Sequence, residues 1–198
     1  MTGSQAKQDE FVLEHLGHMR NGYFLEMGAS DGITFSNTYK LEKEYGWSGL
    51  LVECDPQMFQ SLRHHRSSII DTRPIWSHSN IEVAFKSIEN GALSGIESNL
   101  THPKALIRKG KIHYLNTVSL DNLLRQHECP QHINYFSLDV EGSEYDILST
   151  YSFRHTFDVI TVEHLKNQDE ITSLICSKGY KVKDILLNNK ETIFVRDV

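Results

Sequence analysis

Short apolar runs alternate along the chain with segments whose apolar positions recur every three or four residues. Residues 23–27 (Y-F-L-E-M) and 49–53 (G-L-L-V-E) have the length and composition of buried strands. Residues 8–19, 36–45 and 56–65 have the spacing of amphipathic helices. The first part of the chain therefore predicts a helix followed by a βαβ unit.

The same alternation continues to the end of the chain. Further helices are predicted at 119–127, 143–151 and 169–178, and further strands at 68–71, 81–88, 112–118, 133–138 and 157–162. Two last strand-like runs, 181–187 and 191–195, are separated by N-N-K, which suits a tight turn. This order predicts a doubly wound, mainly parallel sheet of the α/β class, which all the strands join and which ends in an antiparallel C-terminal hairpin.

With 198 residues, 39% of them hydrophobic, the chain is long enough for one substantial core. We expect a single domain over 1–198, with an N-terminal helical segment at 1–22. Residues 90–110 are polar and glycine-rich, and a loop of that length often has a function. We expect this loop to contact the acceptor of the reaction, with His102, Lys104 and Arg108 as candidate contacts.

Twenty Lys and Arg stand against 26 Asp and Glu, which gives a formal charge of −6. A chain without a basic excess is not expected to bind nucleic acid or an anionic membrane. No apolar stretch approaches the roughly 20 residues of a membrane span, and the N-terminus lacks the apolar core of a signal peptide. We therefore expect a cytoplasmic protein. Its three cysteines show no C-x-x-C pairing.

The turn E-M-G-A-S-D-G after the first strand is a candidate nucleotide site. Gly28 and Gly32 allow backbone conformations and close ligand approach that a side chain would obstruct. Ser30 departs from the strict dinucleotide motif G-x-G-x-x-G. The next strand ends in Glu53, 53 − 32 = 21 residues after Gly32, where a carboxylate can accept both hydroxyls of a ribose. Together the turn and the acid indicate an adenosine cofactor.

Glu26 lies among apolar residues, and a buried carboxylate needs partners. Backbone amides of the turn, or the ammonium group of a methionine moiety, are the candidates. Trp76 and Ser77, after the third strand, are candidates for an adenine pocket. The alternative is that Trp76 is a residue of the hydrophobic core.

Three polar residues follow two strands that are expected to be neighbours in the sheet. Asp139 follows the strand at 133–138, and Glu163-His164 follow the strand at 157–162. Their side chains are therefore expected to meet. His164 suits a general base because its unperturbed pKa of about 6.5 lies near neutrality. Alternatively, Asp139, Glu163 and His164 would hold Mg, Mn or Ca, which would acidify a hydroxyl group. Glu141 is a candidate auxiliary base.

These motifs resemble those of the FkbM-like family of S-adenosylmethionine-dependent methyltransferases. The likeness runs through G-Y-F-L-E-M-G-A-S-D-G, L-L-V-E-C-D-P, L-S-G-I, T-V-S-L-D-N-L-L, S-L-D-V-E-G-S-E-Y-D-I-L and V-E-H. The resemblance implies a class I methyltransferase sheet, S-adenosylmethionine as the methyl donor, and O-methylation of a sugar, glycan or other secondary metabolite. Glu26 and Met27 stand where the family often has D-I or D-V, and Ser30 where Asn is common.

The predicted donor site consists of residues in these turns and strand ends. They are Glu26, Gly28, Ala29, Ser30, Asp31, Gly32, Ser36, Glu53, Cys54, Trp76, Ser77, Asp139 and Val140. Catechol O-methyltransferases look similar in placing an acid after the fourth strand and an acid-amide pair after the fifth to hold magnesium. Two alternatives stay open: a nicotinamide-dependent oxidoreductase, and a nucleoside-binding module without catalytic activity.

Overall fold

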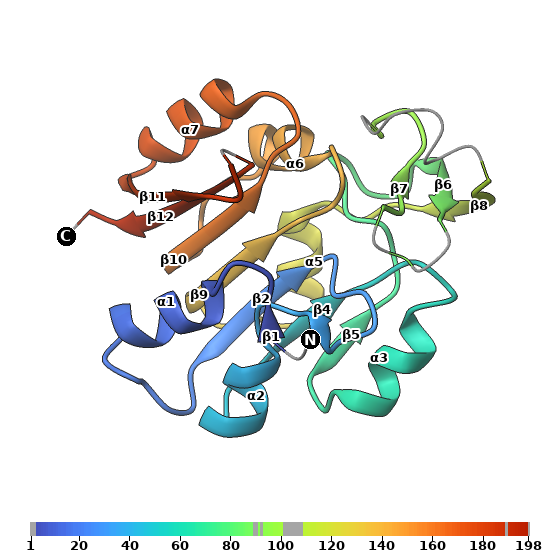
Figure 1. Ribbon diagram of the computed structural model, residues 1–198. Helices are drawn as coiled ribbons and strands as arrows, with labels where there is room; N and C mark the ends of the chain where they lie inside the picture. Colours follow the sequence, from blue (N-terminus) through green and yellow to red (C-terminus); the bar gives the residue numbers. More distant parts are fainter. Residues whose placement is uncertain (1–2, 89–90, 92, 101–108, 189, 198) are drawn as a thin grey trace.

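The computed structural model describes residues 3–88, 91, 93–100, 109–188 and 190–197, and it has a twisted central sheet with helices on both faces (Figure 1). Among the described residues, seven strands form this sheet in the order β11-β12-β10-β9-β2-β4-β5. In chain order the strands are β2 (Tyr23–Met27), β4 (Ser48–Val52), β5 (Ile69–Asp71), β9 (His132–Leu138), β10 (Thr156–Glu163), β11 (Tyr180–Leu186) and β12 (Glu191–Arg196).

The strand order reverses at the centre of the sheet. From β2 the chain moves outward through β4 to β5, then returns to place β9 on the other side of β2, followed by β10. These pairings are parallel, so the turns after β2 and β9 meet at one edge, where ligands bind in open α/β sheets. The last strand, β12, pairs antiparallel with both β10 and β11. The predicted fold class and the closing hairpin are confirmed.

In the described part of the chain, helices cover both faces of the sheet (Figure 1). On one face, α1 (Gln8–His15), α2 (Tyr39–Tyr45) and α3 (Phe59–His65) share a buried cluster with Phe24 of β2. On the other, α5 (Leu120–Gln126), α6 (Glu144–Thr150) and α7 (Gln168–Cys176) pack with Leu25. Consecutive residues of β2 thus contribute to opposite cores, as the twofold period of a strand requires. No described helix has the length and apolar composition to cross a membrane.

A second, smaller sheet lies off the carboxyl ends of the parallel strands (Figure 1). It consists of β6 (Glu82–Ser87), β7 (Gly95–Ile96) and β8 (Lys111–Asn116), all antiparallel in the order β7-β6-β8. The prediction that residues 81–88 and 112–118 extend the main sheet is therefore wrong. In β6 only alternate side chains are buried, including Val83 and Phe85, which suits a sheet with one covered face.

Helix α2 begins later than predicted because of polar contacts at its start, whereas α5 begins directly after Ser119. Residues 36–38 stay outside α2, where the Ser36 hydroxyl accepts the backbone N–H groups of Thr38 and Tyr39. Ser119 occupies the N-cap position of α5, but its side chain makes no capping bond and lies 3.2 Å from the Ser79 hydroxyl instead. The contact between Ser79 and Ser119 joins residues 40 positions apart, which periodicity does not report.

Candidate active site

A cavity of about 720 Å³ opens at the carboxyl ends of β2, β4, β9 and β10. Most of the predicted site residues line it: Gly28, Ala29, Ser30, Asp31, Ser36, Glu53, Cys54, Asp139, Val140, Glu141 and Glu163. The small sheet contributes Phe85, Gly95 and Ile96 to the opposite wall. The volume is typical of a site for a small molecule or cofactor.

The glycine turn is packed directly against the end of β9. Gly28 has φ 87°, and a Cβ atom added there would lie 1.8 Å from the backbone oxygen of Asp139. Gly32, with φ 81°, does not line the cavity and packs against the side chains of Leu62 and Arg66. Side chains would be strained at both positions. The glycines thus bring the turns after β2 and β9 into contact beside the cavity.

Asp31 fixes the far side of this turn. One of its carboxylate oxygens accepts the N–H groups of Ile33 and Thr34 at 2.9 and 2.7 Å, and the other accepts the Thr34 hydroxyl at 2.7 Å. Partial burial opposes ionisation, but these hydrogen bonds outweigh it and lower the pKa of Asp31. The Asp31 carboxylate therefore stabilises the loop through hydrogen bonds, although the residue borders the cavity.

Glu53 connects the two turns that border the nucleoside side of the cavity. Its two carboxylate oxygens accept the backbone N–H groups of Ser30 and Asp55, each at 2.7 Å. Burial, helped by the charge of Asp55 and opposed by these hydrogen bonds, raises the pKa of Glu53 from 4.5 to about 7. Each carboxylate oxygen can accept a further hydrogen bond, so Glu53 keeps the capacity to bind a ribose diol.

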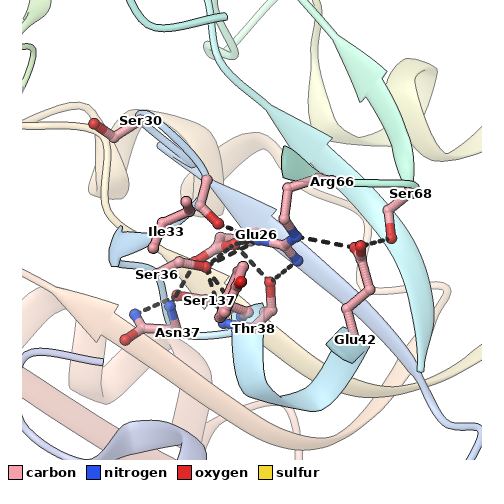
Figure 2. A network of polar contacts seen from close by, with 12 residues as sticks. Glu26, Ser30, Ile33, Ser36, Asn37, Thr38, Glu42, Arg66, Ser68 and Ser137 are labelled. Carbon is pink, nitrogen blue, oxygen red and sulfur yellow. Dashed lines mark hydrogen bonds and ion pairs between the residues drawn. The ribbon is translucent and has the colours of Figure 1, made fainter. Parts of the chain in front are cut away.

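Glu26 lies beneath the turn and does not line the cavity. Figure 2 shows its carboxylate surrounded by donors from the segment after the turn and from the end of α3. It accepts the hydroxyls of Ser36 and Thr38 and the backbone N–H of Asn37, the last at 2.7 Å, and lies 3.5 Å from the guanidinium of Arg66. Protein groups therefore supply the partners that this buried carboxylate needs.

The predicted adenine contacts Trp76 and Ser77 do not line the cavity. The Trp76 indole N–H donates to Asp146 of α6 at 3.1 Å. The two residues before it, Pro74 and Ile75, line the cavity instead, as do Met58 and Phe85. This apolar wall, the ribose-binding capacity of Glu53 and the close approach permitted by Gly28 fit the adenosine part of S-adenosylmethionine.

Two carboxyl groups meet at the other end of the cavity. The carboxyl groups of Asp139 and Glu163, at the ends of neighbouring strands, lie within hydrogen-bonding reach of each other. Burial, and then the charges of Glu163 and Glu141, raise the pKa of Asp139 well above its ordinary value. Glu144, at the start of α6, accepts the backbone N–H groups of Val140 and Gly142 and so holds the turn that presents these acids.

His164 does not lie with these acids. It is only 3% exposed, it does not line the cavity, and its Nε2 atom lies 2.8 Å from the Thr192 hydroxyl on β12. Burial lowers the pKa of His164 below its ordinary value. The expectation that this imidazole faces the acceptor is therefore corrected: the ring belongs to the contact between β10 and β12.

The metal hypothesis loses its third ligand with His164. In the part of the chain that the structure describes, no group of three or more His, Cys, Asp or Glu side chains is arranged to hold a metal ion. The predicted set Asp139, Glu163 and His164 therefore does not fit a metal ion.

Several residues that line the cavity are absent from the predicted site, among them Gln5, Phe35 and Lys190. Gln5 follows β1 (Gly3–Ser4), which pairs with β3 (Thr34–Phe35) in the loop after β2. Lys190 lies in the final hairpin turn, which the pairing of β12 with β10 places beside Glu163. The predicted C-terminal hairpin could have indicated that Lys190, in its turn, lies near the site. The predicted acceptor contacts His102, Lys104 and Arg108 lie outside the described residues.

Comparisons with known proteins identify the family of this chain. A family model described as the methyltransferase FkbM domain matches residues 26–182, from β2 into β11. Among solved structures, the chain is 10% identical to precorrin-6y C5,15-methyltransferase from Geobacter metallireducens, with a TM-score of 0.50 over 94% of this chain and 84% of that one. No curated protein is significantly similar in sequence.

Two other solved structures are similar at lower scores. A SAM-dependent methyltransferase from Aquifex aeolicus is 8% identical, with a TM-score of 0.45 over 96% of this chain and 89% of that one. A methyltransferase from Pyrococcus furiosus is 16% identical, with a TM-score of 0.44 over 96% and 81%. Identities this low bear on the fold alone, whereas the family model covers most of the chain. The protein therefore belongs to the FkbM family of S-adenosylmethionine-dependent methyltransferases.

Proposed function

We propose that this methyltransferase is an O-methyltransferase that acts on a hydroxyl group of a sugar or glycan. The observation that supports O-methylation best is the pair of Asp139 and Glu163, whose carboxyl groups line the cavity within hydrogen-bonding reach of each other. Burial, and then the charges of the neighbouring acids, raise the pKa of Asp139 well above its ordinary value. A carboxyl group with a raised pKa is a stronger base than an ordinary one.

The chemistry needs a base because a neutral alcohol is a weak nucleophile. When bound, S-adenosylmethionine supplies a methyl group made electrophilic by its positively charged sulfur. A carboxylate of the Asp139–Glu163 pair would accept the proton of the acceptor hydroxyl as its oxygen is methylated. The pair would lose one negative charge in this step, so that no third group would be needed. This role replaces the one that the sequence predicts for His164.

A sugar acceptor is supported by three residues that line the cavity, Gln5, Phe35 and Lys190. Gln5 and Lys190 offer hydrogen-bonding groups and are exposed, and Phe35, at 47% exposure, presents an aromatic ring. A sugar ring combines hydroxyl groups with an apolar face of C–H bonds, so it can use both kinds of contact. Phe35 adopts φ 59°, which is costly for an aromatic residue and indicates that the surrounding chain fixes its position.

A methyl-transfer screen tests the proposal. The protein would be incubated with S-adenosylmethionine labelled in its methyl group and with monosaccharides, disaccharides, oligosaccharides, and amines of similar size. We expect label to appear in an ether of at least one carbohydrate, and not with Asp139→Asn as the matched inactive control. Transfer to amines alone would contradict O-methylation, and transfer only to hydroxyl compounds other than sugars would contradict the acceptor class.

A further inference from the structure

Residues 93–99, here called the strap, cross one side of the cavity between the tips of two strands. The strap includes β7, and Leu93, Ser94, Gly95 and Ile96 line the cavity. It belongs to the small sheet, since Phe85 of β6 pairs with Ile96. The strap includes the motif L-S-G-I, which has no role in the donor binding and proton transfer described above.

One end of the strap is fastened to Asp55, which follows β4. The Asp55 carboxylate has no exposed surface, and it accepts the hydroxyls of Ser87 at 2.6 Å and Ser94 at 2.8 Å and the backbone N–H of Gln57 at 2.9 Å. Hydrogen bonds to an ionised acceptor in a buried site are stronger than those between neutral groups. Asp55 therefore ties the end of β6 and the start of the strap to the donor side of the cavity.

Ser94 is the link in this contact. Its hydroxyl donates to Asp55 and accepts the backbone N–H of Ile88 at 2.8 Å. The same turn contains the bond from the Ser94 N–H to the oxygen of Gly91, at 3.1 Å. One hydroxyl group thus closes the turn that leads into the strap and attaches that turn to Asp55.

The other end of the strap is fastened to the acid side of the cavity. A Cβ atom added at Gly95 would lie 3.3 Å from Cβ of Glu141 and 3.5 Å from the oxygen of Val140, so the strap backbone runs against the turn after β9. The Asn99 amide then donates to Ser143 and to Asp146, both at 2.9 Å. The strap therefore bridges the β4 and β9 tips, with the cavity beneath it.

We infer that the strap retains the bound methyl donor, and that Asp55 is a positioning residue which holds the strap through Ser94. Asp55 is two residues from Glu53, and the Asp55 N–H donates to the Glu53 carboxylate. The group expected to bind the ribose and the group that fastens the strap thus share one short turn. The inference rests on donor binding in this cavity, as in the proposed function.

Dissociation of S-adenosylhomocysteine, the product form of the donor, tests the inference without an acceptor. Ser94→Cys keeps the size of the side chain but replaces a strong hydroxyl donor with a weak one, whereas Ser94→Thr keeps the hydroxyl. We expect Ser94→Cys to speed dissociation, measured by stopped-flow fluorescence, by roughly tenfold, on the order of the loss of one hydrogen bond to a charged group. Ser94→Thr should dissociate at nearly the wild-type rate.

Further measurements separate positioning from general damage. Ser173→Ala, on the exposed side of α7, is the matched control and should change neither the rate nor the melting temperature. Asp55→Asn should act like Ser94→Cys, and the double variant should lose little more than either single one, because both break the same contact. Full additivity of the two effects would overturn the role of Ser94 as the link.

The failures of the two proposals are distinguishable. Wild-type protein that does not bind S-adenosylhomocysteine, by calorimetry, would refute the donor site and the strap together. Wild-type binding with an unchanged dissociation rate in Ser94→Cys would overturn the strap alone and leave the donor site standing. Slow dissociation in Ser94→Cys but fast dissociation in Ser94→Thr would also overturn it, since side-chain volume and not the hydroxyl would then decide retention.

Discussion

Glu26 and Asp139 are carboxylic acids at the ends of two neighbouring strands, β2 and β9, yet their surroundings are opposite. Glu26 is 3% exposed and is surrounded by hydroxyl, amide and guanidinium donors (Figure 2). Asp139 lines the cavity and faces Glu163 and Glu141, with their like charges. The first environment stabilises a charge and the loop around it. The second makes a charge costly, which is the condition under which a carboxylate takes up a proton.

The largest expected effect follows from replacing the acid that faces like charges. Asp139→Asn replaces an ionisable group with an amide and leaves no carboxyl pair to accept the proton of the acceptor. We expect kcat to fall on the order of 10²–10⁴-fold, the usual contribution of general base catalysis. The measurement is methyl transfer to the best sugar from the screen, at saturating donor. Binding of S-adenosylhomocysteine should change by no more than about threefold if Asp139 acts mainly in the transition state.

Glu163→Gln should reproduce that loss, because either partner is needed to form the pair. Asp169→Asn, on the exposed surface of α7, is the matched control and should leave kcat unchanged. If Asp139→Asn kept full turnover with donor binding intact, Asp139 and Glu26 would belong to the same structural class, and the comparison would fail.

The opposite outcome is expected for Glu26. Glu26→Gln places an amide donor against the hydroxyl and amide donors of Ser36, Asn37 and Thr38 and removes a charge beside Arg66. Loss of one partner from a buried pair typically costs about 3–5 kcal/mol in unfolding free energy. Arg66 retains Glu42 at 2.9 Å, so we expect about 3 kcal/mol, near the lower end of that range. Urea denaturation measures the change.

The accompanying kinetics make the test of Glu26 specific. Turnover per folded molecule should stay within about threefold of the wild-type value, because the residue does not reach the cavity. Glu44→Gln, exposed on α2, should alter stability by less than about 0.5 kcal/mol. A large loss of donor affinity in Glu26→Gln, without loss of stability, would return Glu26 to the donor site that the sequence predicts.

Glu53 lies between these two extremes and predicts a pH dependence. Its pKa of about 7 means that it is mostly protonated at pH 6 and mostly ionised at pH 8, and only the ionised form accepts both ribose hydroxyls. Affinity for S-adenosylhomocysteine should therefore fall roughly tenfold from pH 8 to pH 6, measured by calorimetry. In Glu53→Gln the profile should flatten. An unchanged slope in that variant would assign the dependence to another group.

The sign of the linked stability change is the reverse of that for a salt-bridged acid. Since the pKa of Glu53 is higher in the folded chain than its ordinary value of 4.5, the folded state binds more protons between about pH 4.5 and 7. Its contribution to stability is therefore present below pH 4.5 and is lost as the pH rises towards 7. Donor binding and stability should thus respond to this group in opposite directions.

Local patterns were sufficient to predict the sheet and the turns that reach its edge. Apolar runs, the glycine turn and the acid at Glu53 are all defined within short segments, and strand order in this fold follows from few alternatives. The small sheet was not predictable in the same way. Its strand at 82–87 has the alternation of any half-buried strand, and nothing local shows whether its partner is β5 or a later segment.

The sequence also does not show where a side chain points. This explains why some residues predicted for the site do not line the cavity. A sequence shows that Trp76 and Ser77 follow the third strand, but not that the chain bends so that Pro74 and Ile75 reach the cavity. It likewise shows a carboxylate at Glu26 but not Arg66, 40 residues later, which helps to hold it below the turn. Such contacts depend on tertiary packing, which hydrophobic periodicity does not encode.

The smallest predicted effect concerns His164, which is adjacent in sequence to Glu163 but belongs with Glu26 in structural character. Consecutive residues of a strand point to opposite sides, so an acid that faces the cavity places the next side chain away from it. His164→Asn keeps a polar group near the Thr192 hydroxyl and should change kcat by no more than about threefold, with the pH profile of turnover unmoved. The measurement is turnover per active site, titrated with S-adenosylhomocysteine. A fall in kcat as large as that of Asp139→Asn, with donor binding intact, would return the imidazole to the role of base and leave the carboxyl pair as its support.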